Sequence, residues 1–432
     1  MANLEDIVSL AKRRGFIYQG SEIYGGLAGT WDYGPLGTQL KRNLISQWLK
    51  FFVDSNSDMY QIDSSILMNP KVWQASGHVD TFTDPMVECG NCGMRFREDQ
   101  LDQSKPCSNC GKSGQFRQAQ QFNLMFKTNV GPIQTDDNVT YLRPETAQGM
   151  FTNYKNILDT FYPDMPFGLA QVGKAFRNEI SPRDFLFRVR EFEIMEFEYF
   201  VNPAHWEADF ERLQQLMLDW FKHIGLAQDK LKTIEVPEDD RAHYSKRTVD
   251  FQYDFPSLGF DEIGGLAYRT DFDLTNHQKA TGKDMSYRPK DGSEPFVPHV
   301  IEPTFGVDRN LLAVLSQAYS EDEQGGEKRT FLKLPSHLAP VKAAVFPLLK
   351  NKPELIEKAR SVFDHVNGEL GAVMFDDNGN IGKRYRRQDE IGTPYCITVD
   401  FQTLEDHSVT VRNRDTTEQI RVKGSDLINH LQ

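Results

Sequence analysis

The sequence predicts an α+β protein with a large mixed domain, a cysteine-rich insertion within it and a smaller C-terminal α/β domain. Three observations lead to this fold class. Residues 140–200 alternate strand-like runs with turns, and further such runs follow at 260–275 and 296–304. Four cysteines gather between residues 86 and 118. From about residue 338 strands and helices alternate, as in a separate α/β unit.

Composition limits the classes of function. The chain has 432 residues, enough for two or three domains, and a formal net charge of -13. This charge argues against a protein that holds nucleic acid through its overall field, so a polyanion must meet local basic faces. No apolar run approaches the roughly 18 residues of a membrane helix, and the N-terminus lacks a signal-peptide core. We therefore expect a cytoplasmic protein with no membrane partner.

The N-terminal elements follow from apolar spacing. Residues 36–54 repeat large apolar side chains at steps of four, which predicts an amphipathic helix. The run MYQIDSSILMNP indicates a strand that Pro70 stops. The same helical spacing predicts helices over 203–224 and 306–320.

The C-terminal third begins with a charged, glycine-containing segment, EDEQGGEKR, which we interpret as a linker. Beyond it, VKAAVFPLL, GAVMFDD and YCITVDF indicate strands, and PELIEKARSVFDHV indicates a helix. SVTVRNRD and QIRVKG are typical of a hairpin, and SDLINHL of a closing helix. Together these elements predict an independent domain of about 95 residues, within the usual size range of domains.

The four cysteines form a C-x2-C-x14-C-x2-C pattern made by Cys89, Cys92, Cys107 and Cys110. In a reducing compartment, paired CxxC units indicate a metal more than a disulfide. A glycine follows each pair and permits the tight turn that lets two thiolates face one metal. Four thiolates leave no open position, so we expect a structural zinc ribbon, with free thiols as the alternative.

The segment FRNEISPRDFLFRVREFEIMEFEYF, residues 176–200, carries charge on both faces, although buried charges normally need partners. Alternation predicts that one strand face presents Arg190, Phe192, Ile194 and Glu196. Such a row suits a planar base with phosphates at one end and an amine at the other. The preceding strand supplies Arg177 and Glu179, so SPRDFLF is the predicted loop between two antiparallel strands. The alternative is an exposed hairpin with surface ion pairs.

The segment 176–200 contains the pieces FRNE and FRVREFEIMEF. Two other motifs, WDYGPLG and YLRPETAQGMF, precede it in the chain, and IEPTFGVDR follows it. Together they resemble the three signature motifs of class II aminoacyl-tRNA synthetases, and their wording is similar to glycyl-tRNA synthetases of the homodimeric, class IIa type. The resemblance runs from about residue 5 to the C-terminus. It implies an antiparallel-sheet catalytic domain at 1–335 with the insertion at 86–118, an anticodon-binding domain at 338–432, and a homodimer.

The resemblance also implies a reaction. Glycine attacks the α-phosphorus of ATP to form glycyl adenylate, and tRNA(Gly) then accepts the glycyl group. Arg177 and Arg309 are the implied catalytic residues, at the α- and γ-phosphates. Phe192 and Arg309 enclose the adenine, Glu179 accepts from its amino group, and Glu262 helps to hold Mg²⁺. The implied ATP-binding set is Arg177, Asn178, Glu179, Phe187, Arg188, Val189, Arg190, Glu191, Phe192, Glu262, Ile263, Gly306, Val307, Asp308 and Arg309.

For the amino acid, the resemblance implies that Glu145, Glu196 and Glu302 hold the ammonium group and Arg269 faces the carboxylate. Thr304 stands where the family usually has serine, which keeps the hydroxyl but adds a methyl group. Since no amino acid is smaller than glycine, no editing domain is expected. The full implied set is Arg97, Glu145, Phe192, Glu193, Ile194, Met195, Glu196, Arg269, Glu302, Thr304 and Gly306.

The C-terminal domain resembles the anticodon-binding domain of class IIa synthetases. Lys383, Arg384, Arg386 and Arg387 form a basic stretch there, suited to RNA phosphates and bases. The alternative for each is a solvated helix face.

Two other functions remain open at this level. One is another class IIa synthetase, for proline or threonine, although a proline pocket needs room that three glutamates do not suggest. The other is a non-catalytic nucleic-acid-binding relative, which we expect to lose the phosphate arginines and pocket carboxylates that this sequence keeps. Synthesis of dinucleoside tetraphosphates is a further conceivable side activity.

Overall fold

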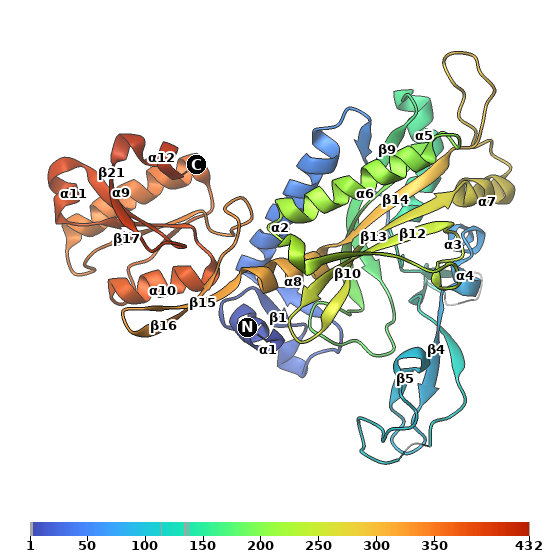
Figure 1. Ribbon diagram of the computed structural model, residues 1–432, viewed down its shortest axis with the longest axis horizontal. Coiled ribbons are helices and arrows are strands. Elements are labelled where there is room, and N and C mark those ends of the chain that lie inside the picture. The colour runs from blue at the N-terminus through green and yellow to red at the C-terminus, as the bar shows by residue number, and fades with distance from the viewer. Residues whose placement is uncertain (1–2, 114, 134, 136–137, 432) are drawn as a thin grey trace.

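The computed structural model describes residues 3–113, 115–133, 135 and 138–431. Figure 1 shows an elongated molecule whose C-terminal part forms a separate body beside a larger one. Helix α1 (Leu4–Arg13) lies where the two bodies meet. Within the described residues, no helix combines the length and apolarity that crossing a bilayer requires.

A seven-stranded sheet organises the larger body, with the strand order β11-β12-β13-β14-β10-β9-β3. Neighbouring strands run antiparallel, except that β3 and β9 run parallel. The α+β fold class with an antiparallel main sheet is therefore confirmed. The strands are β3 (Met59–Gln61), β9 (Phe167–Phe176), β10 (Glu191–Val201), β11 (Leu231–Glu235), β12 (Arg247–Phe255), β13 (Gly259–Thr270) and β14 (His299–Gly306).

Strands β9 and β10 confirm the predicted antiparallel pair around SPRDFLF, with Phe176 opposite Glu191. The intervening loop is held by its own apolar residues. Phe185 and Leu186 are buried in the main core, although Phe185 has a φ of 57° that non-glycine residues seldom adopt. Burial of this loop fixes the charged residues on either side of it against the sheet.

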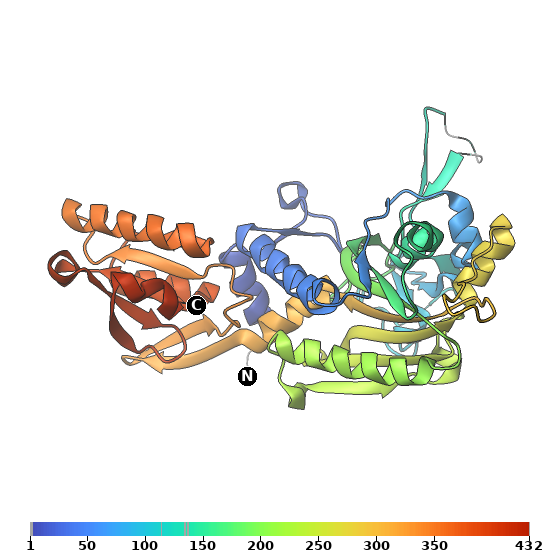
Figure 2. The ribbon, with the colours of Figure 1, turned by 90° about the horizontal axis from the view of Figure 1, so that it is seen from above.

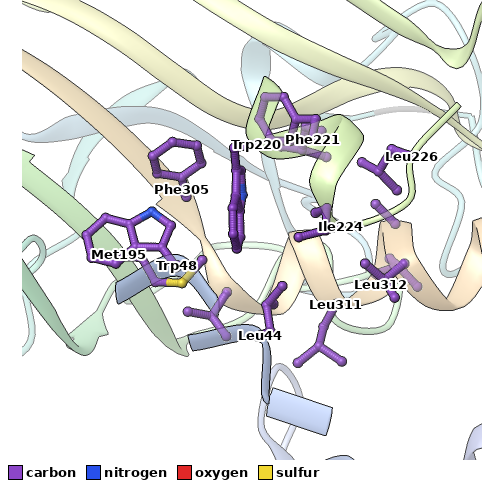
Figure 3. Packing of buried hydrophobic residues seen from close by; sticks show 14 of the residues in the cluster. Leu44, Trp48, Met195, Trp220, Phe221, Ile224, Leu226, Phe305, Leu311 and Leu312 are labelled. Carbon is purple, nitrogen blue, oxygen red and sulfur yellow. The ribbon is translucent and has the colours of Figure 1, made fainter. Parts of the chain in front are cut away.

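Three helices cover one face of the sheet and build the main core: α2 (Pro35–Leu49), α6 (Trp206–His223) and α8 (Val307–Ala318). Figure 3 shows Leu44 and Trp48 beside Met195, Trp220 and Phe305. Alternation along β10 directs Met195, Phe197, Tyr199 and Val201 into this core. The even-numbered side chains of β10 therefore belong to the opposite face.

Helix α5 (Ala147–Phe161) covers part of that opposite face. Phe151 and Tyr154 from α5 pack there against Leu169 and Phe200. Toward the start of β10 the same face carries polar and charged side chains beyond this apolar cluster. Shorter elements complete the larger body: β1 (Ile17–Gln19), β2 (Trp31–Tyr33), α3 (Pro70–Ala75), α4 (His78–Thr81) and α7 (Phe272–Thr281).

The predicted helices over 36–54, 203–224 and 306–320 are confirmed as α2, α6 and α8; α2 continues into one π-helical turn, Lys50–Asp54. Helix α5 is a correction, because it lies within residues 140–200, which we assigned to strands and turns. Its buried residues recur at helical spacing, a period that the neighbouring turn signals obscured.

Two other expectations need correction. Pro70 does not end a strand but occupies the first turn of α3, where its missing N–H removes no helical hydrogen bond. The segment at 321–329 is not a linker but the hairpin of β15 (Tyr319–Gln324) and β16 (Glu327–Leu332). Its turn residues Gly325 and Gly326 both have positive φ, as tight hairpins require.

The cysteine-rich insertion projects from the larger body as a narrow arm (Figure 1). Its three-stranded sheet has the order β5-β4-β6, and a separate hairpin of β7 and β8 follows. The strands are β4 (Thr83–Glu88), β5 (Arg95–Arg97), β6 (Gln120–Asn123), β7 (Lys127–Asn129) and β8 (Val139–Tyr141).

The C-terminal body has a five-stranded mixed sheet, with the order β18-β17-β19-β20-β21, and its own apolar core. Helices flank this sheet in Figure 2, and the hairpin of β20 and β21 confirms the predicted one. The elements are β17 (Ala343–Pro347), α9 (Pro353–Leu370), β18 (Val373–Phe375), α10 (Ile381–Ile391), β19 (Tyr395–Val399), α11 (Phe401–Asp406), β20 (Ser408–Asn413), β21 (Gln419–Lys423) and α12 (Leu427–Leu431).

Candidate active site

A cleft opens over the first half of β10, on the face opposite the main core. Phe192, Ile194 and Glu196 point to this face because side chains alternate along the strand. On the neighbouring strand β14, Gly306 stands opposite Ile194 and Thr304 opposite Glu196. The floor of the cleft is therefore made by two paired strands from distant parts of the chain.

A cavity of about 120 Å³ lies in this cleft and collects most of the residues predicted to bind ATP. The predicted residues in its wall are Arg177, Glu179, Phe187, Arg188, Val189, Phe192, Ile194, Glu262, Ile263, Thr304, Gly306, Asp308 and Arg309. Leu186 and Gly264 complete the wall. The structure thus assembles one site from the β9–β10 loop, β10, β13 and the β14–α8 junction.

Arginine side chains line the cavity beside aromatic rings. Arg309, in the first turn of α8, donates to Glu262 Oε2 at 2.8 Å, and its guanidinium carbon lies 4.5 Å from the ring centroid of Phe187. Arg177 lies 5.3 Å from the ring centroid of Phe192, and its Nε donates to the Pro144 carbonyl at 3.2 Å. A cleft with guanidinium groups and an aromatic face can bind phosphates and a planar base together.

Next to the cavity lies a second group, the acidic pocket, which we define as Glu145, Glu196 and Glu302 around Arg269. All four side chains are buried, and that of Arg269 is fully so. Arg269 donates to Glu302 and lies 3.9 Å from Glu145 Oε1. The three glutamates come from the segment before α5, from β10 and from β14, so only the tertiary fold brings them together.

The Thr304 hydroxyl joins two of these carboxylates. Its Oγ1 lies 3.0 Å from Glu196 Oε1 and 2.9 Å from Glu302 Oε1. One hydroxyl carries a single hydrogen, so it can donate to one of them at a time. Thr146 donates to the second oxygen of Glu196. The threonine hydroxyl thus sits inside the pocket, as predicted for the position where serine is usual.

The three glutamates of the acidic pocket differ in the direction of their pKa shifts, because burial, repulsion and attraction act on them to different extents. Burial, followed by the charges of Glu302 and Glu145, raises the pKa of Glu196 to about 8. Burial also raises the pKa of Glu302, although Arg269 opposes the shift. For Glu145, burial acts in the same direction, but the attraction of His78 and Arg269 outweighs it and the pKa is lowered. A cation is therefore favoured beside Glu196 and Glu302, whose ionised forms are less stabilised than that of Glu145.

Two supporting residues were missed by the sequence analysis as members of the site. His78 Nε2 lies 3.2 Å from Glu145 Oε2, and its Nδ1 lies 2.8 Å from Ser76 Oγ. Asp273 accepts from Arg269 at 2.8 and 3.0 Å. The i,i+4 spacing of Arg269 and Asp273 is a usable sequence signal. A single histidine at the start of a four-residue helix offers no comparable signal.

Several predicted residues lie outside the cavity wall. Glu193 faces the opposite side of β10 and pairs with Lys41 at 2.8 Å, while Met195 is buried in the main core. Val307 also belongs to that core. Glu191 is exposed and pairs with Lys174 at 2.9 Å. The predicted residues of β10 therefore lie on both faces of the strand, and only one of these faces forms the cleft.

The remaining predicted residues lie at the rim. Arg97 pairs with Asp84 at 2.7 Å and with Asp99 at 2.8 Å. Arg190 donates to the backbone carbonyls of Glu179 and Ala28, which fixes the loop conformation. The backbone N–H of Asn178 donates to the Leu124 carbonyl at 2.7 Å, joining the loop to the base of the insertion.

The four predicted metal ligands come together at the end of the insertion. The Sγ atoms of Cys89 and Cys110 lie 3.9 Å apart and those of Cys92 and Cys107 3.8 Å apart, and all four lie within 4.8 Å of one another. Thiolates at the corners of a tetrahedron about 2.3 Å from zinc stand about 3.8 Å apart. Gly93 and Gly111 have φ values of 71° and 68°, the left-handed turns expected after each pair. The four sulfurs therefore fit a closed zinc site.

The predicted basic stretch lies on α10, but its residues have different surroundings. Lys383 is exposed, Arg386 lies 3.7 Å from Glu327, and Arg387 pairs with Asp376 at 2.6 Å. Arg384 differs from the expectation: it is buried and donates to the carbonyls of Pro347, Asp377 and Gly379. In this conformation its guanidinium group holds a loop and does not reach the surface.

Sequence comparisons agree with this architecture. Residues 126–318 match the family described as "tRNA synthetase class II core domain (G, H, P, S and T)", and residues 342–432 match the "Anticodon binding domain" family. The chain is 47% identical to the "Glycine--tRNA ligase" of Borrelia hermsii, over all of this chain and 97% of that protein. It is also 47% identical to the proteins of that name from Streptomyces coelicolor, over 99% and 97%, and Thermobifida fusca, over 97% and 95%.

These matches do not favour the proline or threonine alternative, because the relatives that cover nearly the whole chain carry the glycine name. They also agree with the order of motifs, the antiparallel sheet and the separate C-terminal body described above. The chain therefore belongs to the glycine--tRNA ligase family of class II aminoacyl-tRNA synthetases.

Proposed function

We propose that this protein attaches glycine to tRNA in an ATP-dependent reaction that passes through glycyl adenylate. One observation carries the proposal. The acidic pocket, formed by Glu145, Glu196 and Glu302, adjoins an arginine-lined cavity in a chain that is 47% identical along its whole length to a protein named "Glycine--tRNA ligase". A group of buried carboxylates suits a cation such as an ammonium group.

In the first step, the glycine carboxylate attacks the α-phosphorus of ATP and pyrophosphate leaves. The attacking group is already ionised, so the protein must supply position and charge rather than a general base. Arg177 is our choice for the α-phosphate and Arg309 for the γ-phosphate, with adenine between Phe192 and Arg309. The positions of these three side chains in the wall of one cavity support this assignment.

Glycine would be held by its two charged ends. Its ammonium group would donate hydrogen bonds to Glu196 and Glu302. Its carboxylate would be directed toward Arg177 and Arg309, the arginines assigned to the phosphates. The resemblance placed Arg269 at the glycine carboxylate, but this side chain is fully buried and already donates to Asp273 and Glu302. We therefore assign to Arg269 the role of orienting the pocket instead. A β-methyl group would meet the surrounding side chains, so alanine is excluded sterically; such a difference is worth about 1–3 kcal/mol.

Mg²⁺ would be held at Glu262, beside Asp250 of β12. Burial and then the charge of Glu262 raise the pKa of Asp250 to about 7. The two carboxylates therefore repel each other, and a hard cation that prefers oxygen ligands would relieve this repulsion. When bound, the metal would neutralise charge on the leaving phosphates. Arg309 compensates part of this charge through its ion pair with Glu262.

Zinc would hold the insertion through its four cysteines and perform no chemistry, since four thiolates leave no open position. Through Arg97 and Asp84, the insertion would shape the rim of the cavity or the path of the tRNA end. Elemental analysis of the purified protein should find about one zinc per chain; no zinc, with four reactive thiols, would contradict this.

We further propose that residues 1–335 form the catalytic domain and 338–432 the domain that reads the tRNA anticodon. Lys383, Arg386 and Arg387 are retained as RNA contacts, and Arg384 is excluded because it is buried. A homodimer and a cytoplasmic location complete the proposal. A monomeric mass in solution at micromolar concentration would contradict the dimer.

The decisive experiment is ATP–pyrophosphate exchange with glycine, alanine, serine and proline offered separately. We expect strong exchange with glycine alone, and equal exchange with proline would overturn the proposal. Arg177→Ala should reduce exchange by at least about 100-fold, in the range found for a lost transition-state charge contact. Arg288→Ala is the matched control, because Arg288 is exposed and lies outside the cleft.

A further inference from the structure

A fourth buried glutamate, Glu198, lies beneath the acidic pocket and outside every set of residues predicted from the sequence. It follows Glu196 by two positions on β10, so both side chains lie on the same face of the sheet. Glu198 is 0% exposed, and neither of its carboxyl oxygens has a hydrogen-bond partner among the described residues. Fully buried polar groups without a partner are rare and call for an explanation.

The neighbours of Glu198 are also carboxylates. One oxygen from each of Glu196, Glu198 and Glu302 lies within 4.8 Å of the others. Hydrogens are scarce in this group, because Thr146 donates to Glu196, Arg269 donates to Glu302, and the single Thr304 hydrogen is shared between those two glutamates. Six carboxyl oxygens therefore share three donors, and one of the three acids can relieve the deficit by keeping a proton.

Glu198 is the group best placed to keep it. The charged groups that face it are Glu302 of β14, Arg269 of β13, Glu196 of β10 and Asp273 of α7. Arg269 is already occupied by Asp273 and Glu302. An ionised Glu198 would be a buried charge without a counter-ion, which is strongly unfavourable. Burial and the charge of Glu302 accordingly raise the pKa of Glu198 well above its ordinary value.

We propose that Glu198 is a positioning residue of the glycine pocket, which remains protonated at neutral pH and donates its hydrogen to the Glu196–Glu302 pair. Glu198 lies between Glu196 and Phe200 on this strand face, and Phe200 belongs to the apolar cluster with α5. The donated hydrogen would hold the two carboxylates in place and lower their mutual repulsion. The inference rests on the proposed function, because the carboxylates that Glu198 orients are those assigned to the glycine ammonium group.

The protonation can be observed without any assay of activity. A neutral carboxylic acid has a carbonyl stretching band that a carboxylate lacks. We expect the infrared difference between the full-length wild type and Glu198→Gln, at neutral pH, to contain one such band. The control Glu235→Gln, an exposed residue paired with Arg247 on the edge strand, should leave the band in place. If the difference spectrum shows only carboxylate bands, Glu198 is ionised and the proposal is overturned.

The positioning role predicts a split between KM and kcat in ATP–pyrophosphate exchange. Glu198→Gln retains a neutral donor of the same shape, so its KM for glycine should stay within about threefold of wild type. Glu198→Leu fills the space without a donor. Its KM for glycine should rise about 10- to 100-fold, with kcat and the KM for ATP nearly unchanged, since a hydrogen bond to a charged group contributes about 1.5–3 kcal/mol.

The outcomes separate this inference from the proposed function. If the wild type shows the neutral-acid band but exchanges no glycine, the proposed function fails while the protonated Glu198 stands. If glycine exchange is normal and Glu198→Leu keeps the wild-type KM, the positioning role fails alone. A metal ion other than zinc in the purified protein, lost in Glu198→Gln, would also overturn the proposal. Should Glu198→Leu fail to fold, the infrared result for Glu198→Gln still decides whether the proton is present.

Discussion

Two buried clusters of charged side chains differ in how completely their charges are paired. In the C-terminal body, Asp389 of α10 is fully buried and accepts from Arg412 at 2.7 and 3.0 Å and from Arg329 at 3.3 Å. Arg329 also pairs with Asp322, in the hairpin that leads out of the larger body. The buried carboxylate of this network, Asp389, therefore meets two guanidinium groups, and the exposed Asp322 meets one.

The acidic pocket in the larger body is built differently. Five buried carboxyl groups gather around the single guanidinium of Arg269, with His78 at one edge. These are Glu145, Glu196, Glu198, Asp273 and Glu302. Arginine is the partner in both clusters, but here acids outnumber it. The surplus of negative charge remains until protons or a cation balance it.

This difference in pairing is the one expected between a structural network and the proposed glycine site. A balanced ion network stabilises the contact between the elements that it connects. Loss of either partner leaves the other charge buried without a counter-ion, which is unfavourable. A cluster with surplus charge destabilises the empty protein, and a bound ligand of opposite charge compensates that surplus. The contrast predicts opposite effects on stability when one carboxylate is removed from each cluster.

The largest effect should follow Asp389→Ala, which leaves Arg329 and Arg412 buried without their shared partner. The free energy of unfolding should fall by about 3–5 kcal/mol, as is typical when one member of a buried ion pair is removed. Denaturant unfolding of the full chain measures this, and glycine exchange at 25 °C should persist. The control Asp364→Ala, at an exposed position of α9, should change stability little. A loss below about 1 kcal/mol for Asp389→Ala would remove the contrast between the clusters.

A smaller effect, with the opposite sign in stability, should follow Glu196→Gln. The kcat/KM for glycine should fall about 100-fold, equivalent to about 2.7 kcal/mol, because Glu196 can release its proton and become a charged acceptor when the ammonium group binds, whereas glutamine cannot. The free energy of unfolding should not fall, since one of several repelling buried carboxylates becomes neutral. A clear loss of stability would mean that the pocket is balanced after all.

The smallest effect, counted per pH unit, is a dependence of stability on pH. The pKa of Glu196 is raised from 4.5 to about 8 in the folded protein, so between these values the folded chain holds a proton that the unfolded chain has released. Its contribution to the free energy of unfolding therefore falls as pH rises through this window, by at most about 1.4 kcal/mol per pH unit. Below and above the window the contribution is constant. Unfolding measured across the window should show a shallower slope for Glu196→Gln.

Asp322 in the C-terminal network should act in the opposite direction. The hydrogen bond from Arg329 lowers its pKa, so the stability that it contributes is lost as pH falls through the folded pKa. The Asp322→Asn variant should therefore lose this acid-side dependence and keep the slope assigned to Glu196. Identical pH profiles for the two variants would contradict the separate origins of the two effects.

Local patterns were sufficient for much of the fold. The apolar spacing of α2, α6 and α8 identified them, because side chains that recur every three or four residues must share one helix face. The CxxC pairs identified the four cysteines that the structure brings together, because the spacing within each pair is local. Helix α5 and the hairpin at 321–329 were missed because neighbouring glycine, proline and charged residues resembled loop signals in a short window.

The sequence by itself determined which chemical groups the protein carries and the order of its motifs, including Arg177, Glu196 and Arg309. The tertiary structure decided which of them meet. Alternation along β10 divides one contiguous motif between a core face with Met195 and a cleft face with Glu196. Burial then decides the charge of each carboxyl group, because protonation depends on neighbours from β13, β14 and α7 that no local pattern can place.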